Sequence, residues 1–168
     1  MEIKAILFDL DGTLVDSAQD LTHSLNSLLA ERALPTLAVE EVKGMIGDGV
    51  LKLVERGLAA TRGDAVEAAA LVPRFLELYE GNAARFTRQY PGVEETLHAL
   101  WAHRLSLAVV TNKPYVASRE ILETLELSRF FRGDSRGRHS AEPEAASRAL
   151  AARGRTARNR TCRHSHGR

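Results

Sequence analysis

The chain has 168 residues, of which 44% are hydrophobic, and its formal net charge at pH 7 is +1. This composition allows one core of ordinary size and a small second domain, and no apolar run approaches the roughly 18 residues that span a bilayer. Glu2 and Lys4 come too early for a secretion signal, and a single cysteine, Cys162, excludes an internal disulfide framework. We therefore expect a cytoplasmic protein with no membrane partner.

Charge is unevenly distributed along the chain. Residues 1–131 carry 13 Lys and Arg against 19 Asp and Glu, whereas residues 132–168 carry 10 Arg against three acidic residues. The tail has Leu150 as its only large aliphatic residue, so it cannot build a core and we expect it to be disordered. One alternative is an Arg-rich tail that binds nucleic acid, although it has no aromatic residue to stack on bases.

The first predicted element is an apolar strand that runs from Ile3 to Asp9. Asp9 and Asp11 stand at its end, and residues two apart in an extended chain point the same way. Both carboxylates are therefore expected in one crevice at the carboxyl end of the strand, where open α/β sheets bind ligands. Gly12 then permits a sharp turn. The alternative is a surface loop in which Asp and Gly simply end the strand.

Helical spacing dominates the next part of the chain. Ser17 to about Arg32 is predicted as a helix, and Ser17 with Asp20 resembles a capping pair. From Leu37 to about Phe86 the apolar residues keep helical spacing, which predicts an all-helical insert.

The break at Gly47-Asp48-Gly49 has two interpretations. It either ends a helix or forms a flexible turn that approaches a substrate closely. Lys43 and Arg56 nearby are candidates for contact with a small anion.

A further helix and strand follow the turn at Tyr90-Pro91-Gly92. The helix is expected to turn Val93, Leu97, Leu100 and Trp101 toward the core. Leu105 to Val110 is a short continuous apolar run, as in a strand buried on both faces. Pro114 then opens another helix at its first position.

Thr111, Asn112 and Lys113 lie between that strand and that helix. A hydroxyl and free backbone amides at a helix N-terminus suit a phosphate, because the unpaired N–H groups and the helix dipole both favour negative charge. An ordinary capped strand-to-helix turn is the alternative. Together with Asp9 and Asp11, however, these residues predict two neighbouring parallel strands whose ends share one crevice.

The segment from Phe8 to Leu14, Phe-Asp-Leu-Asp-Gly-Thr-Leu, resembles the first signature of the haloacid dehalogenase superfamily in its phosphatase form. Thr111-Asn112-Lys113-Pro114 resembles the second motif, and residues 1–131 look most like bacterial phosphoglycolate phosphatases. The resemblance implies an α/β fold, with a doubly wound, Rossmann-like parallel-sheet core and an inserted helical cap. The expected domains are the core (1–15 and 90–131), the cap (16–89) and the Arg-rich tail (132–168).

The resemblance also implies a chemistry: Mg²⁺-dependent conversion of 2-phosphoglycolate to glycolate through an aspartyl-phosphate. Asp9 would be the nucleophile and Asp11 the general acid and base, and the Asp9 carboxylate and the Asp11 carbonyl would hold Mg²⁺. The substrate, a small phosphate monoester, would be bound by Thr13, Thr111, Asn112 and Lys113. A capped phosphatase or phosphomutase acting on small sugar phosphates is the alternative enzyme, and the oligomeric state is left open.

Two parts of the family's site are not found after the second motif: a charge-neutralising Lys and the acidic residues that complete the metal site. Lys113 is the last Lys in the chain, and Gly133-Asp134-Ser135 is at most a fragment of the final motif. Arg, Ala and Gly, all encoded by GC-rich codons, dominate the tail. The hypothesis is a phosphatase truncated or frameshifted after about residue 131, with part of its core missing. A non-catalytic fragment is then a further alternative.

Overall fold

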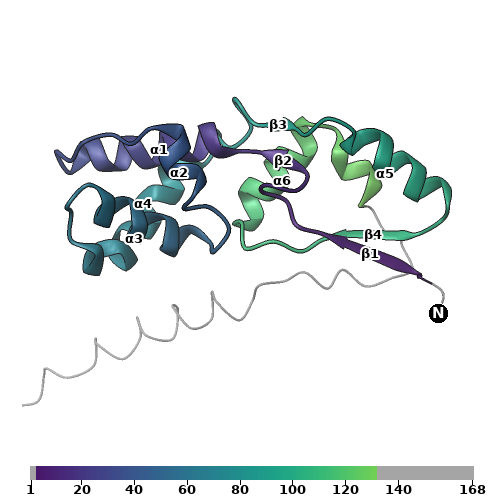
Figure 1. The fold of residues 1–168 in the computed structure, drawn as a ribbon, viewed down its shortest axis with the longest axis horizontal. Coiled ribbons are helices and arrows are strands. Elements are labelled where there is room, and N and C mark those ends of the chain that lie inside the picture. Colours follow the sequence, from purple (N-terminus) through teal and green to yellow (C-terminus); the bar gives the residue numbers. More distant parts are fainter. Residues whose placement is uncertain (1–2, 132–168) are drawn as a thin grey trace, which may run out of the picture. The chain divides into compact units, whose positions relative to one another are not determined.

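A computed structural model describes residues 3–131, which lie within one compact unit of the chain. The tail at 132–168, with the disorder and the frameshift predicted for it, lies outside the described residues. None of the described helices is long and apolar enough to cross a membrane. In chain order (Figure 1) the elements are β1 (Ala5–Phe8), β2 (Val15–Asp16), α1 (Ala18–Glu31), α2 (Val39–Lys43), α3 (Val50–Ala60), the 3₁₀ turn η1 (Ala65–Glu67), α4 (Ala68–Tyr79), β3 (Arg88–Gln89), α5 (Val93–Ala102), β4 (Ser106–Val109), α6 (Tyr115–Thr124) and the 3₁₀ turn η2 (Leu127–Phe130).

Strands β1 and β4 form a parallel pair, as the sequence predicted. The register places Ala5 opposite Ser106 and Phe8 opposite Val109. Both strands therefore end level with each other, and the residues after Phe8 and after Val109 leave the sheet at the same edge. The parallel pair and its helices confirm the α/β class.

The expected burial of the Leu105–Val110 strand on both faces is wrong for the described residues. Burial alternates along β1 and along β4, so only one face of the pair is covered. Leu107 is buried, whereas Leu7 is 66% exposed and Val110 is 61% exposed. The continuous apolar run was typical of a doubly covered strand, but the described helices pack against one side only.

The insert is helical, as predicted, and α1, α2, α3 and α4 pack on one another (Figure 1). Gly57 lets α3 approach α1 closely, because a Cβ at this position would lie 2.9 Å from Leu25 Cδ1. The two ends of the insert meet where β2 pairs antiparallel with β3, with Val15 opposite Gln89. The predicted domain boundaries at residues 15 and 90 stay a prediction.

Ser17 and Asp20 do not form the predicted capping pair. Ser17 begins α1 without a side-chain cap bond, and its hydroxyl donates to Asp11 instead. The Asp20 carboxylate accepts the backbone N–H groups of Phe86 and Thr87 at 2.8 to 3.0 Å, and also the Thr87 hydroxyl at 2.7 Å. Asp20 therefore binds the segment at Phe86 and Thr87, which leads out of the insert, to α1. The bonded residues lie far apart in the sequence.

Trp101 does not lie in the core either. Its side chain is 60% exposed, although Leu97 on the same helix, α5, is fully buried. Trp101 lies in the last turn of the helix, and α5 has only that one buried residue. Its apolar stripe is therefore narrower than the sequence pattern indicated.

Candidate active site

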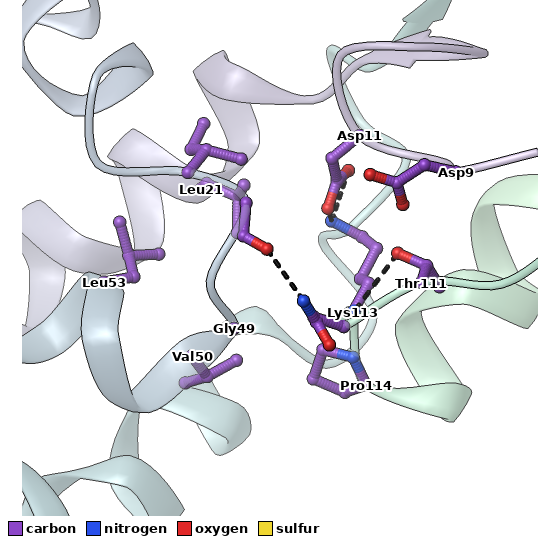
Figure 2. A pocket seen from close by; sticks show the side chains of 12 residues that line it. Asp9, Asp11, Leu21, Gly49, Val50, Leu53, Thr111, Lys113 and Pro114 are labelled. Carbon is purple, nitrogen blue, oxygen red and sulfur yellow. Dashed lines mark hydrogen bonds and ion pairs between the residues drawn. The ribbon is translucent and has the colours of Figure 1, made fainter.

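One pocket lies where the ends of β1 and β4 meet the helical insert (Figure 2). Its lining from the β1 and β4 ends consists of Asp9, Asp11, Thr111, Asn112, Lys113 and Pro114. Its lining from α1 and the insert consists of Leu21, Ile46, Gly47, Gly49, Val50 and Leu53. Five of the six predicted site residues thus share one pocket. They lie together because the parallel strands β1 and β4 end at the same edge.

Asp9 and Asp11 face the same pocket from different environments (Figure 2). Asp9 is exposed, accepts the Leu10 N–H at 2.7 Å and forms no ion pair with any described residue. Asp11 is half-buried, and its carboxylate accepts hydrogen bonds from the Ser17 hydroxyl and the Lys113 ammonium. Asp9 is therefore free to approach a bound group, while Asp11 is held in one orientation.

The Lys113 ammonium is buried in this site. Its Nζ lies 3.0 and 3.1 Å from the two carboxylate oxygens of Asp11, and its side chain is only 1% exposed. Burial lowers the pKa of Lys113, and the neighbouring Asp11 carboxylate opposes that shift. The ring of Tyr79 lies on the ammonium, with its centroid 4.9 Å from Nζ.

Thr111 and Asn112 form the turn that leads into α6. The Thr111 hydroxyl accepts the Lys113 N–H at 3.2 Å, and Pro114 is the N-cap of α6 rather than its first helical residue. The Asn112 side-chain amide donates to the Gly47 carbonyl at 3.0 Å. This hydrogen bond joins the turn after β4 to the loop between α2 and α3.

The glycines of the insert do face the pocket. Gly47 and Gly49 both line it, and Gly49 has a φ of +86°. A Cβ at Gly49 would lie 3.6 Å from the Asn112 carbonyl oxygen, in ordinary van der Waals contact, so a methyl group here would occupy space at this wall, and the positive φ favours glycine.

Lys43 and Arg56, the candidate anion contacts, do not line the pocket. The Lys43 ammonium lies 3.4 Å from the Asp16 carboxylate, and Asp16 raises the pKa of Lys43. The Arg56 guanidinium pairs with Asp48 and donates to the Met45 carbonyl at 2.9 Å. The positive charges of Lys43 and Arg56 are thus each paired with an acidic side chain, Asp16 and Asp48.

Thr13 is the predicted site residue that the pocket does not include. It is exposed and lines a second hollow together with Phe8 and the turn at Tyr90–Gly92. Its contact with substrate stays a prediction. Asp134, the candidate acid of the final motif, lies outside the described residues.

Oxygen donors at this site suit a hard cation. Asp9 and Asp11 line the pocket together, and Mg²⁺ in proteins is commonly held by one or two carboxylates together with water and substrate phosphate. Residues 3–131 contain no group of three or more His, Cys, Asp or Glu placed to hold a metal. Asp9 and Asp11 are therefore the residues in this pocket whose oxygen atoms would hold such an ion.

Ser17 and Tyr79 contact the site residues Asp11 and Lys113, although neither was predicted as a site residue. Ser17 was assigned to a cap, although it ends the segment Phe8 to Ser17 that resembles the first signature, and this position was a signal that could have placed it near Asp11. Tyr79 belonged to an apolar helical stripe, and nothing in that pattern distinguishes an aromatic ring over an ammonium from an ordinary core residue.

Comparison with known proteins agrees with this geometry. The sequence profile of the haloacid dehalogenase-like hydrolases matches residues 6–136. A phosphoglycolate phosphatase of Caulobacter vibrioides is 44% identical over 128 residues, which are 75% of this chain and 54% of that protein. One of Cereibacter sphaeroides is 42% identical over 154 residues, which are 88% of this chain and 70% of that protein. The chain thus spans about half of the first relative's length.

The solved structures point the same way. The crystal structure of a predicted phosphoglycolate phosphatase from Haemophilus somnus 129PT matches with a TM-score of 0.70 and 33% identity. The match covers 90% of this chain and 72% of that one. A putative haloacid dehalogenase-like hydrolase from Bacteroides fragilis, at 18% identity and a TM-score of 0.68, shares the fold.

Proposed function

Because the chain belongs to the haloacid dehalogenase-like hydrolase family, we propose that it hydrolyses small phosphate monoesters, with 2-phosphoglycolate as its substrate. The observation that carries this proposal is the meeting of Asp9, Asp11 and the turn Thr111–Lys113 in one pocket. The relatives from Caulobacter and Cereibacter, which bear the name phosphoglycolate phosphatase, support the choice of substrate. The cytoplasmic location expected from the sequence is part of the proposal.

Asp9 is the proposed nucleophile. Its carboxylate is exposed to the pocket and pairs with no cation of the described residues, so an oxygen atom can reach a bound phosphorus. Attack forms an aspartyl-phosphate and releases the alcohol of the substrate, and water then cleaves the acyl-phosphate. Two easier displacements replace one slow step.

Asp11 is the proposed general acid and base. A proton on its carboxylate passes to the departing alkoxide in the first step, and the carboxylate takes a proton from the attacking water in the second. Ser17 and Lys113 fix the orientation of this carboxylate through their hydrogen bonds to Oδ1. Because proton transfer needs short, aligned contacts, this fixed orientation favours both transfers.

The phosphoryl oxygens are proposed to bind at the turn before α6. The Thr111 hydroxyl and the Asn112 amide line the pocket beside Asp9, and the helix dipole at this end of α6 favours negative charge. Lys113 adds a positive charge at the same place. Thr13 is proposed as a further substrate contact on the strength of the motif alone.

Mg²⁺ is the proposed cofactor, and the Asp9 carboxylate and the Asp11 carbonyl are the residues proposed to hold it. When bound, the ion neutralises the negative charge of carboxylate and phosphate, which would otherwise repel each other. The carboxylate oxygens of Asp9 and Asp11, which line the pocket, support this choice.

A substrate series tests the proposal. Phosphate release by the full chain is measured with 2-phosphoglycolate and with small sugar phosphates, each with Mg²⁺ and with the ion chelated, after circular dichroism has shown that the chain folds. We expect Mg²⁺-dependent release, fastest from 2-phosphoglycolate. Faster release from a sugar phosphate would instead favour the sugar-phosphate alternative, and no release from any ester would overturn the phosphatase proposal.

A further inference from the structure

The ammonium of Lys113 is removed from water almost completely. Its side chain is 1% exposed, and burying a charge is unfavourable unless other groups compensate it. The Asp11 carboxylate compensates one side of the ammonium through two contacts of 3.0 and 3.1 Å. Another group must cover the part of the ammonium that Asp11 does not contact, and it must do so without forming its own hydrogen bond to the Asp11 carboxylate.

The ring of Tyr79 lies on that remaining surface. Its centroid is 4.9 Å from Lys113 Nζ, within the range at which the negative face of an aromatic ring attracts a cation. Tyr79 is the last residue of α4, is 1% exposed and packs on Phe75, whose ring centroid is 5.7 Å away. Its hydroxyl is buried, and no residue within 3–131 forms a hydrogen bond with it. The ring face of Tyr79, and not its hydroxyl, therefore contacts the site.

Hydrogen bonds fix the position of this ring relative to α6. The Glu120 carboxylate of α6 accepts the N–H of Gly81 at 3.3 Å and the N–H of Ala83 at 3.1 Å, just after Tyr79. Lys113 precedes Pro114, the N-cap of α6, so the segment after Tyr79 and the residue that carries the ammonium are both connected to this helix. Asp20 fastens the end of the same returning segment at Thr87.

We propose that Tyr79 is a positioning residue, whose ring face holds the Lys113 ammonium against the Asp11 carboxylate. A helix of the insert thereby sets the orientation of the acid and base at the end of β1. The effect on catalysis rests on the proposed phosphatase function, whereas the placement of the ammonium under the ring does not. The two statements can therefore be tested separately.

Lysine NMR tests the placement directly. The chain has only four lysines, Lys4, Lys43, Lys52 and Lys113, so lysine labelled at the ε carbon gives four resolvable signals, and Lys113→Arg identifies one of them. Protons above the face of an aromatic ring are shifted upfield by its ring current. We expect the Lys113 ε protons upfield of the other three in the wild type.

Three substitutions distinguish the effect of the Tyr79 ring on the Lys113 signal from the effect of a general change in packing. Tyr79→Phe keeps the ring and should keep the upfield shift, whereas Tyr79→Leu should return the Lys113 signal to the range of the other lysines. Phe75→Leu removes a neighbouring buried ring from the same helix and should leave the shift in place. A Lys113 signal that is not displaced in the wild type, or that keeps its displacement in Tyr79→Leu, overturns the proposal. The wild-type spectrum alone decides the matter if Tyr79→Leu does not fold.

Kinetics then test the consequence for the reaction. For Tyr79→Leu we expect kcat with 2-phosphoglycolate to fall about tenfold while KM changes less than about twofold, and for Tyr79→Phe we expect kcat to be restored. A fall in kcat that Tyr79→Phe does not restore would overturn the positioning role. A chain that shows the NMR shift but releases no phosphate from any ester would overturn the phosphatase function and leave the placement of Lys113 intact.

Discussion

The ammonium of Lys113 contacts both carboxylate oxygens of Asp11, although 102 residues separate them in the sequence. The contact joins the turn after β4 to the turn after β1, at the edge where the two strands end together. It also places a positive charge beside the two aspartates. The sequence indicated that a charge-neutralising lysine was absent, because Lys113 belongs to the second motif.

Substituting Asp11 should destabilise the chain more than substituting Lys113. The Lys113 side chain is 1% exposed and that of Asp11 is 11% exposed. Asp11→Asn leaves a buried ammonium without its carboxylate and should lower the free energy of unfolding by about 3 to 5 kcal/mol. Lys113→Met leaves a carboxylate that keeps Ser17 and some water, so its cost should be about 1 to 2 kcal/mol. Urea denaturation measures both, and equal or reversed costs would refute the asymmetry.

Tyr79→Phe should stabilise the chain. The Tyr79 hydroxyl is buried and forms no hydrogen bond with any described residue, so its removal should end a desolvation cost of about 1 kcal/mol. Tyr90→Phe is the matched control, because Tyr90 is 36% exposed and its hydroxyl should change stability by less than about 0.5 kcal/mol. Both are measured by urea denaturation. A loss of stability in Tyr79→Phe would mean that this hydroxyl has a partner after all.

Gly49→Ala should impair substrate binding beyond its effect on the backbone. Gly49 and Gly81 both have positive φ values, +86° and +73°, so alanine strains either position by about 1 to 2 kcal/mol. At Gly49 the added methyl also meets Asn112 in the pocket, whereas at Gly81 nothing lies within 4 Å. We therefore expect a higher KM for Gly49→Ala and an unchanged KM for Gly81→Ala. The same KM for both variants would argue against Gly49 as a wall of the substrate site.

The contact between α1 and α4 should depend on pH. Arg74 donates to both carboxylate oxygens of Glu31 and holds the pKa of Glu31 below its usual value of 4.5. A lowered pKa in the folded state stabilises the chain fully above 4.5, and this stabilisation is lost as the pH falls through the lower value. The stability difference between the wild type and Glu31→Gln should therefore shrink below pH 4.5. If the stability difference between the two chains stays constant until Glu31 is fully protonated, the Arg74–Glu31 contact does not make stability depend on pH.

Local patterns were sufficient to predict most of the architecture. Apolar spacing predicted the helices of the insert, and the two short apolar runs predicted strands β1 and β4. Their parallel pairing then followed from the need to bring Asp9 and Thr111 together, and the pocket contains both. The helices and strands depend on residues within a few positions of one another, for which periodicity is informative, whereas the pairing of the two strands depended on the matching polar residues at their ends.

Contacts between distant segments could not be predicted in the same way. Ser17 and Asp20 fit a local cap, but the Ser17 hydroxyl donates to Asp11, and the Asp20 carboxylate accepts from Thr87, which is 67 residues away. Trp101 fit an apolar stripe, yet whether a stripe position is covered depends on which element packs there. The ring of Tyr79 over Lys113 has no sequence signal, because any buried aromatic residue satisfies the same helical pattern.

The central claim, that Asp9 is the nucleophile, is tested most directly by measuring phosphate release from 2-phosphoglycolate with Mg²⁺. The wild type is compared with Asp9→Asn and with the matched control Asp64→Asn, because the Asp64 side chain accepts the Val66 N–H in η1 and does not line the pocket. Losing the nucleophile typically lowers the rate by several powers of ten. We predict activity in the wild type and in Asp64→Asn, and none above background in Asp9→Asn. Equal activity in all three folded chains would contradict the account.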